Sequence, residues 1–287
     1  MINSMSRRVI PRLLCLGSLI CTTATYAQNL SLGSASGFGL LGLENGTVTI
    51  NSATKLVGNV GYSKGVVSNI NQKVESFRGS ALVHSKASFS YTAASFQPSG
   101  GIQKGAATDS RLDSANQDVL LLAQNLSGLT ATQSVGFLND NDSRTFVSTG
   151  SLNVIDISGV NYLEDSLTLQ SRSGLTDTFI LRVAGNFRFS ASSVILEGLT
   201  ASNVMFYFPN ESKILIENAA TTFNGTILAP MGWVEYQSPG SYNGSIIAKN
   251  INLQSALNHT QVNFVPEPSA AFFGVIGAAL LVLRRKR

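Results

Sequence analysis

The feature that most constrains the fold is an internal repeat in the second half of this 287-residue chain. The segment Phe223-Asn224-Gly225-Thr226-Ile227-Leu228-Ala229 recurs as Tyr242-Asn243-Gly244-Ser245-Ile246-Ile247-Ala248, shifted by 19 residues. Similar shifts relate Asn186–Phe189 to Met205–Phe208, and they relate Val194–Glu197, Ile214–Glu217, Val234–Tyr236 and, at a shorter step, Ile251–Leu253. Short strands at a near-constant period, separated by Gly and Asn turns, predict an all-β fold, a β-solenoid whose coils pack on one another.

The repeat also predicts which side chains form the core. Phe187, Phe206, Ile227 and Ile246 are expected to point inward, each against the next coil. A β-sandwich also has short regular strands, but it does not predict matched residues at a constant shift. The N-terminal part offers alternating segments at 46–50, 56–62 and 81–91 without so regular a period. We therefore predict a right-handed β-solenoid (β-helix) over residues 28–264.

One α-helix is expected between the two strand-rich parts, over about residues 110–127. Apolar residues recur there at spacings of three and four, as one helix face requires: Leu112, Ala115, Val119, Leu122 and Leu126. Asp109 or Ser110 is the expected N-cap, and Gly128 stands just past the end. In a β protein, such a helix is predicted to pack its apolar face along the side of the solenoid.

The N-terminus has the pattern of a secretory signal peptide over residues 1–27. Arg7, Arg8 and Arg12 precede an apolar stretch over 13–21, and small residues allow cleavage between Ala27 and Gln28. Both cysteines of the chain lie inside this segment, so the mature protein is expected to contain neither disulfides nor cysteine chemistry.

The C-terminal segment 265–287 has three blocks in a fixed order. They are Val265-Pro266-Glu267-Pro268, an apolar run over 269–283, and Arg284-Arg285-Lys286-Arg287. As a helix the apolar run would reach about 22 Å, short of the roughly 30 Å hydrocarbon core, and the four cations would stay in the cytoplasm. The order resembles the PEP-CTERM sorting signal, although an ordinary C-terminal membrane anchor is an alternative.

That resemblance implies a short transmembrane sorting helix, present before processing, and an exosortase-like processing enzyme as partner. It also implies export to the cell envelope, outer surface or extracellular matrix of a Gram-negative bacterium, and it links such proteins to exopolysaccharide.

The solenoid segment resembles a second kind of domain. Phe206-Tyr207-Phe208-Pro209, the two Asn-Gly repeats, and Gly46-Thr47-Val48-Thr49-Ile50 with Gly58-Asn59-Val60-Gly61 are similar to the β-helical domains of choice-of-anchor A proteins and of the bacterial ice-binding-like family. Because the paired glycines of the anchor A group are missing, the choice between the two families stays open. Neither resemblance implies catalysis.

Composition argues against a nucleic-acid partner. Seven of the 20 basic residues lie in the two ends, which leaves 13 against 15 acidic residues once Glu267 is set aside. A nucleic-acid-binding surface would need a basic patch, and none is visible. Abundant Gly, Ser, Asn and Thr fit an extracellular protein of short strands and tight turns.

Residues for catalysis or metal binding are sparse. His84 and His259 are the only histidines, neither is at a metal-ligand spacing, and each is interpreted as a turn or strand-face residue. Asp140 and Asp142, in an Asn-Asp-Asn-Asp-Ser run, are candidates for calcium, but the EF-hand pattern fails and a solvated turn is the favoured interpretation. We therefore expect no enzyme activity and no cofactor.

Two surface features suggest binding. Exposed aromatic residues could stack on sugar rings: Tyr207, Trp233, Tyr236 and Tyr242 are the candidates for glycan contact, against the alternative that Trp233 and Tyr236 cap the core. Ice binding would need a ladder of small hydroxylated side chains. The predicted outward rows are Arg188, Tyr207, Thr226 and Ser245, and Ile195, Leu215, Glu235 and Asn252. Neither is such a ladder, although a third face could carry one.

The sequence therefore predicts an exported structural or adhesive protein of the cell surface or matrix, sorted through its C-terminus. The resemblance suggests exopolysaccharide as its partner. The alternatives are an ice-binding protein, an anchored enzyme acting on matrix polysaccharide, and a calcium-dependent adhesin.

Overall fold

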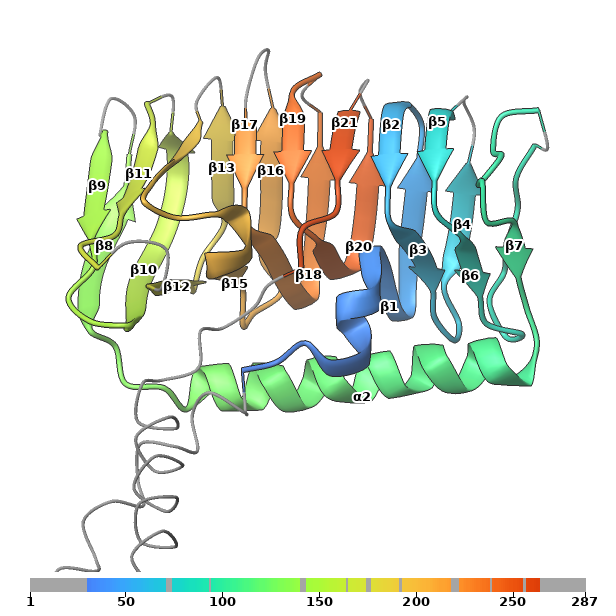
Figure 1. The fold of residues 1–287 in the computed structure, drawn as a ribbon, viewed down its shortest axis with the longest axis horizontal. Helices are drawn as coiled ribbons and strands as arrows, with labels where there is room; N and C mark the ends of the chain where they lie inside the picture. Colours follow the sequence, from blue (N-terminus) through green and yellow to red (C-terminus); the bar gives the residue numbers. More distant parts are fainter. Residues whose placement is uncertain are drawn as a thin grey trace, which may run out of the picture. The chain divides into compact units, whose positions relative to one another are not determined.

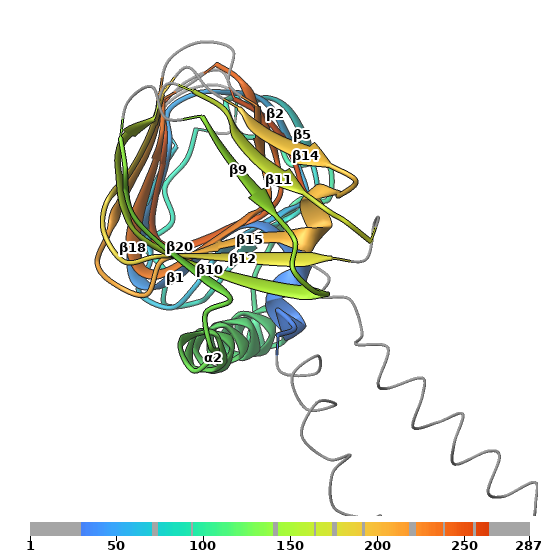
Figure 2. The same cartoon turned by 90° about the vertical axis from the view of Figure 1, so that its left-hand side faces the viewer.

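The part of the chain that the structure describes folds into a three-sided β-solenoid with one α-helix along its side (Figure 1). The computed structural model describes residues 30–70, 74–92, 94–139, 143–163, 165–173, 177–190, 193–217, 222–237, 239–254 and 257–263. Strands from successive coils pair in parallel, for example Phe223 with Tyr242 and Ile227 with Ile246. Seen end on in Figure 2, the sheets enclose a triangular core, and α2 (Ala106–Ser127) lies outside one side. The predicted solenoid with one helix is confirmed.

The side that α2 covers is named the helix face. It contains β3 (Asn59–Tyr62), β6 (Ala81–Val83), β7 (Ile102–Gln103), β8 (Gln133–Leu138), β12 (Thr178–Val183) and β15 (Val204–Tyr207). It also contains the first parts of four long strands, β1 (Phe38–Ile50), β10 (Leu152–Leu163), β18 (Thr226–Tyr236) and β20 (Ile246–Leu253).

The four long strands turn a corner and continue on what we name the second face. The start of β18 pairs with β15, whereas its end, Trp233–Tyr236, pairs with Lys213–Ile216 of β16. The second face is completed by β4 (Val67–Ile70), β13 (Phe187–Ser190) and β16 (Lys213–Glu217).

The third face consists of eight short strands. They are β2 (Ala53–Val57), β5 (Val74–Arg78), β9 (Arg144–Val147), β11 (Leu167–Gln170), β14 (Val194–Glu197), β17 (Thr222–Asn224), β19 (Ser241–Asn243) and β21 (Leu257–Thr260). Two 3-10 helices, η1 (Gly33–Gly37) and η2 (Ala201–Asn203), lie outside the strands.

The coils are not stacked in sequence order. Leu40 of β1 pairs with Ile246 of β20 on one side and with Val60 of β3 on the other. The N-terminal coils therefore extend the solenoid beyond its C-terminal coil, and the colours in Figure 1 run from green through red before jumping to blue. The helix α2 returns from β7 to β8; its 22 residues span about 33 Å, or roughly seven strand spacings.

The core consists of inward side chains stacked from coil to coil. Leu181, Phe206, Ile227, Ile246 and Leu40 are in register on the helix face, and all five are at most 1% exposed. Phe223, Tyr242 and His259 form a similar stack inside the third face. Fully burying one such apolar side chain stabilises the fold by about 1.5–3 kcal/mol, so stability is distributed along the whole axis.

The predicted register is confirmed in part. The shift of 19 that matches Ile227 to Ile246 and the shift of 20 that matches Ile214 to Val234 are both observed. Two other matches are wrong. Phe206 pairs with Leu181 rather than Phe187, which lies on the second face, and Ile214 pairs with Phe187 rather than Val194. The coils before residue 214 are longer, so a constant shift of 19 or 20 joins strands of different faces.

The predicted apolar face of the helix is confirmed. Each of its five predicted residues is at most 1% exposed, and they pack against outward apolar side chains of the helix face such as Leu41, Leu228 and Ile247. The helix begins at Ala106, earlier than predicted, and no side chain caps it. The Asp109 carboxylate instead accepts hydrogen bonds from the backbone N and the hydroxyl of Ser85 (2.9 and 2.6 Å), which lowers its pKa. Gly128 is the C-cap, as expected.

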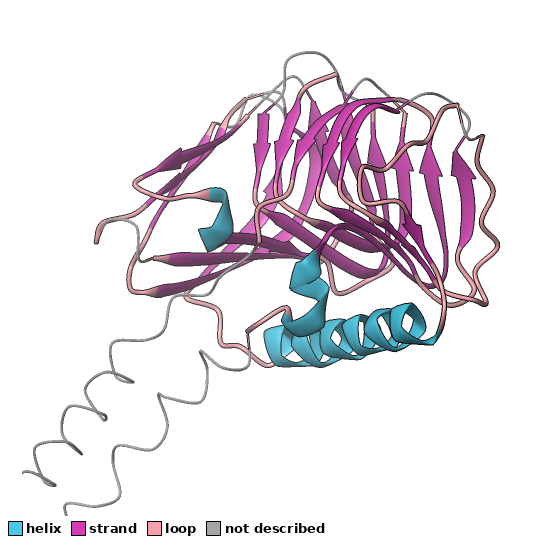
Figure 3. Ribbon diagram, turned by 45° about the vertical axis from the view of Figure 1, so that its right-hand side comes forward, coloured by secondary structure: helices cyan, strands magenta, loops and turns pink. Residues whose placement is uncertain are grey.

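The helix is also held at its sides. Figure 3 shows η1 packed between α2 and the strands, where the backbone N of Ser34 donates to the Asp118 carboxylate at 2.6 Å.

Candidate functional site

The second face is divided into a charged part and an uncharged part. In the charged part, the Arg188 guanidinium lies 2.6 Å from the Glu217 carboxylate and 4.5 Å from the centre of the Tyr162 ring. The Lys213 ammonium lies 3.1 Å from the Glu235 carboxylate. These side chains come from β10, β13, β16 and β18. Paired charges therefore occupy the half of the second face that these four strands form.

The uncharged part begins at β20 and continues over β1, β4 and the segment after β6. Two rows of outward side chains cross it: Asn250, Thr47, Val67 and Ser88, and Asn252, Thr49, Asn69 and Ser90. All eight are small or medium-sized and none carries a charge. We name these eight residues the uncharged patch.

The regularity of the uncharged patch follows from the strands beneath it. Val48 and Ile251 point inward and are at most 1% exposed, so the residues on either side of each point outward. Neighbouring strands are about 4.8 Å apart and alternate residues about 6.7 Å apart, which makes a two-dimensional array. The array is held locally, because the Asn250 amide oxygen accepts a hydrogen bond from the Thr47 backbone N at 3.0 Å.

The third face is less uniform. Short polar side chains do line up on β17, β19 and β21, where the Asn243 amide donates to the Asn224 amide oxygen at 2.9 Å. On either side of these strands, however, Glu197, Lys55 and Arg78 take outward positions. The uncharged part of the third face is therefore three strands wide, whereas the uncharged patch on the second face extends over four neighbouring coils.

One of the predicted outward rows is wrong and the other is correct in part. Thr226 and Ser245 are fully buried, Tyr207 is in register with Leu228 under the helix, and Arg188 is in register with Leu215. In the second row, Leu215, Glu235 and Asn252 do line up, but Ile195 belongs to the third face, beside Thr168. The same unequal coil lengths explain both differences.

The four aromatic candidates for glycan contact do not form one exposed cluster. Tyr236 and Tyr242 are 0% exposed inside the solenoid, and Tyr207 is 3% exposed beneath α2. Only Trp233 of the four is open to solvent, at 49%. The interpretation of these four residues as a shared aromatic surface is therefore wrong.

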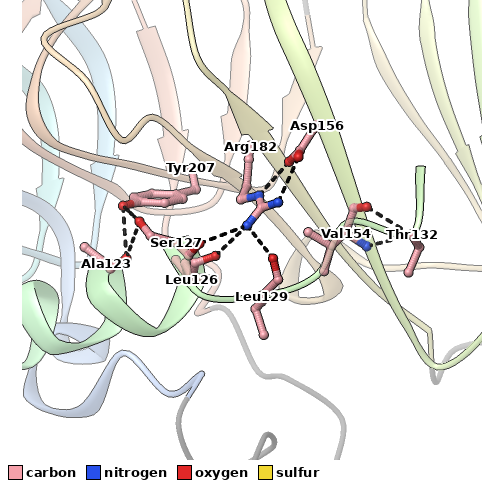
Figure 4. Close-up of polar contacts among 9 residues, drawn as sticks. All are labelled: Ala123, Leu126, Ser127, Leu129, Thr132, Val154, Asp156, Arg182 and Tyr207. Atoms are coloured by element: carbon pink, nitrogen blue, oxygen red, sulfur yellow. Dashed lines mark hydrogen bonds and ion pairs between the residues drawn. The ribbon is translucent and has the colours of Figure 1, made fainter. Parts of the chain in front are cut away.

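Tyr207 instead helps to attach the helix. Its hydroxyl donates to the Ala123 carbonyl oxygen at 3.0 Å and lies 2.9 Å from the Ser127 hydroxyl (Figure 4). Beside it, the Arg182 guanidinium donates to both Asp156 carboxylate oxygens at 2.6 and 2.9 Å and to the Leu126 and Leu129 carbonyls at 3.1 and 2.7 Å. The cluster fixes the C-terminal end of α2 to the solenoid.

The two histidines occupy a turn and a strand, as predicted. His84 directly follows β6; its Nδ1 accepts a hydrogen bond from the Lys86 backbone N at 3.0 Å, and its Nε2 lies 3.4 Å from the Asp113 carboxylate. His259 is buried in β21, where burial lowers its pKa to about 4. Within the described ranges, no three His, Cys, Asp or Glu side chains are grouped as a metal site would require.

Several predicted residues lie outside the described residues. These are the calcium candidates Asp140 and Asp142, the cleavage pair Ala27 and Gln28, and the whole segment from Val265 to Arg287 with Pro266, Glu267, Pro268, Arg284, Arg285 and Lys286. Among the helices that the structure does describe, none combines the length and the apolar character needed to span a membrane.

Sequence reasoning missed most of the uncharged patch. Thr47 and Thr49 stand in an alternating segment that the sequence displays, but their neighbours Asn250 and Asn252 come from the other end of the chain. The Thr-x-Thr, Val-x-Asn and Ser-x-Ser spacings of three successive coils were the available signal.

The described residues thus define a class of protein by their fold: a β-solenoid with non-sequential coils, a helix along one face and an uncharged array on another. The chain belongs to the family described as "Putative Ice-binding-like adhesive domain", whose sequence pattern matches residues 22–260. No curated protein shows significant sequence similarity to it.

Solved structures that share the fold include the following three. An ice-binding protein from the Antarctic ascomycete Antarctomyces psychrotrophicus is 20% identical, with a TM-score of 0.56 over 82% of this chain and 98% of that one. A glycosylated ice-binding protein from an Arctic yeast is 19% identical (TM-score 0.58, 84% and 97% covered). An ice-binding protein domain from Shewanella frigidimarina is 16% identical (TM-score 0.55, 82% and 97% covered). All three are described as ice-binding proteins.

Proposed function

We propose that the domain binds ice, and that the uncharged patch is the surface that contacts it. The observation that carries this proposal is the register of four coils, which places eight small uncharged side chains in a regular array. The family description and the fold of the three relatives support ice binding over the structural matrix role that the sequence first suggested.

The physical argument concerns the water next to the patch. A Lys ammonium is a compact, strongly hydrated charge that orders water around itself. An array of hydroxyl, amide and methyl groups makes weaker, evenly spaced contacts, which allows the adjacent water to adopt a lattice repeat.

The test compares one substitution on two faces. Asn69→Lys places a charge within the uncharged patch, and Asn258→Lys places the same charge at an exposed position of β21 on the third face. The purified protein is expected to reshape growing ice crystals and to show thermal hysteresis. Asn69→Lys should lose most of both effects and Asn258→Lys should keep them.

Either of two results would contradict the proposal. Absence of any effect of the unmodified protein on ice would exclude ice binding, and loss of activity in Asn258→Lys but not in Asn69→Lys would move the surface to the third face.

We also propose, from the sequence of the two ends alone, that the domain is exported and sorted at the envelope of a Gram-negative bacterium by an exosortase-like enzyme. The intact mass of the native protein in each cell fraction tests this. Loss of residues 1–27 and a cut near Pro266-Glu267-Pro268 are expected, and a tail that remains attached in the inner membrane would contradict it.

A further inference from the structure

The exposed tryptophan of the second face lies in a hollow with a distinct chemistry. Trp233 and Met231 of β18 are 49% and 48% exposed, and the two large apolar side chains lie side by side in this hollow. They line a shallow hollow of about 280 Å³ at the corner between the helix face and the second face. Its other walls are polar: Lys213 and Lys249 carry positive charges, Glu211 carries a negative charge, and Ser212 and Asn250 are uncharged.

The strand register places polar groups on both sides of the indole. Trp233 is paired with Lys213 on one neighbouring strand and with Asn250 on the other, each about 4.8 Å away. Lys213 is held in place because its ammonium lies 3.1 Å from Glu235. Glu235 is itself fixed, since its other carboxylate oxygen accepts hydrogen bonds from Gln237 and Gln254 at 2.8 Å.

Lysine residues continue from this hollow along the same corner of the solenoid. Lys249 lies at the corner within β20, and Lys64 and Lys86 lie in the corner turns of nearby coils. These turns are joined, since Gly65 N donates to the Lys86 carbonyl and Asn45 N to the Lys64 carbonyl. Glu44 stands in the turn between Lys249 and Lys64. An extended ligand that lies along the solenoid axis from Trp233 would thus meet ammonium groups at intervals.

We propose that this corner binds an acidic polysaccharide, with one sugar ring seated in the hollow. A flat aromatic face with an amide beside it suits a pyranose ring, because the indole covers the apolar C–H face and the amide can bond a hydroxyl. Lys249 supplies the charge for a carboxylate of the ligand. This inference does not rest on ice binding: the hollow shares only Asn250 with the uncharged patch, and its test involves no ice.

The test uses the fact that Trp233 is the only tryptophan of the chain. Tryptophan emission, excited selectively over that of tyrosine, therefore reports on the hollow alone. The probes are polygalacturonate and its fully methyl-esterified form, which has the same backbone without the charge. Polygalacturonate is expected to change the emission in a saturable manner, the ester only weakly, and added salt should weaken the response.

Variants locate the site by a second readout, retardation in a gel that contains polygalacturonate. Trp233→Leu should lose most of the retardation, and Lys249→Gln should lower the apparent affinity several-fold. Lys55→Gln is the control: it removes a charge from the third face and should change neither the retardation nor the affinity. Circular dichroism checks that each variant is folded. An emission unchanged at saturating polygalacturonate, or unaltered retardation of Trp233→Leu, would overturn the proposal. Equal affinity for the ester would overturn the acidic specificity.

Discussion

The imidazole of His259 is stacked on the ring of Tyr242, with ring centroids 5.6 Å apart and planes 15° from parallel. Phe223 continues the stack on the other side of Tyr242, also at 5.6 Å. A titratable ring thus takes a place in the core that an aromatic hydrocarbon could fill. Its Nε2 lies 3.1 Å from the Gly244 carbonyl oxygen, but burial in the solenoid disfavours the imidazolium.

Stability should therefore fall in mild acid. The folded-state pKa of His259 is about 4 and that of an unfolded histidine about 6.5, so the unfolded chain binds the proton first. The contribution of neutral His259 to the free energy of unfolding is fully present above pH 6.5. It is lost as the pH falls from 6.5 to 4, by up to about 3 kcal/mol. Urea unfolding across this range measures it. His259→Phe keeps the stack and should flatten the dependence; an unchanged slope would assign the loss to other groups.

The attachment of the helix end should depend on Arg182. Arg182→Met removes the hydrogen bonds to Asp156 and to the Leu126 and Leu129 carbonyls, and is expected to reduce the free energy of unfolding by about 2 kcal/mol. Amide exchange in the last turn of α2 should rise. The control is Arg188→Met: that side chain is 49% exposed, so its ion pair should contribute less than about 1 kcal/mol. Equal losses in the two variants would show that the helix end needs no such anchor.

The packing of α2 can be tested with two adjacent leucines. Leu122 is 1% exposed against the helix face, whereas Leu121 is 58% exposed on the opposite side. Leu122→Ala should cost about 2–5 kcal/mol in unfolding free energy. Leu121→Ala should change it by less than about 0.5 kcal/mol. Chemical denaturation of both variants provides the comparison, and a small effect at Leu122 would mean that the helix is only loosely attached.

The corner turn of the repeat should tolerate only glycine. A Cβ added to Gly244 would overlap the carbonyl oxygen of Gly225 in the preceding coil, whereas a Cβ on Gly136 would meet no atom within 4 Å. Gly244→Ala is therefore expected to lower the unfolding free energy by roughly 3 kcal/mol or more, and Gly136→Ala to change it little. Thermal melts of the two variants decide; similar melting temperatures would mean that the coils can separate at this corner.

The sequence predicts what is repeated locally and fails where the fold is not periodic. Ile227 and Ile246 could be matched because the two coils between β17 and β21 have nearly equal lengths and the same Asn-Gly turn. Phe187 was matched to Phe206 because a coil with a longer insertion puts similar Phe-x-Phe segments on different faces.

The candidate site was harder to predict than the core. The inward position of a residue follows from its own alternating strand, but a surface row depends on which coils are neighbours. The contact of Thr47 with Asn250 joins residues from opposite ends of the domain, and no periodicity in the sequence encodes it. The helix start was missed for a related reason, since Asp109 binds Ser85 of the solenoid rather than the helix terminus.

The position of β1 between β20 and β3 has a consequence for how the protein is made. The coils over residues 38–103 are synthesised first. One edge of Phe38–Ile50 stays unpaired in them until Ile246–Leu253 has been synthesised. Long-range pairing of this kind is slow and leaves strand edges open in the meantime. A chain that emerges N-terminus first from the ribosome or a translocation channel cannot form this pairing until nearly all of the domain has passed through. The domain therefore finishes folding only when almost its whole length is outside.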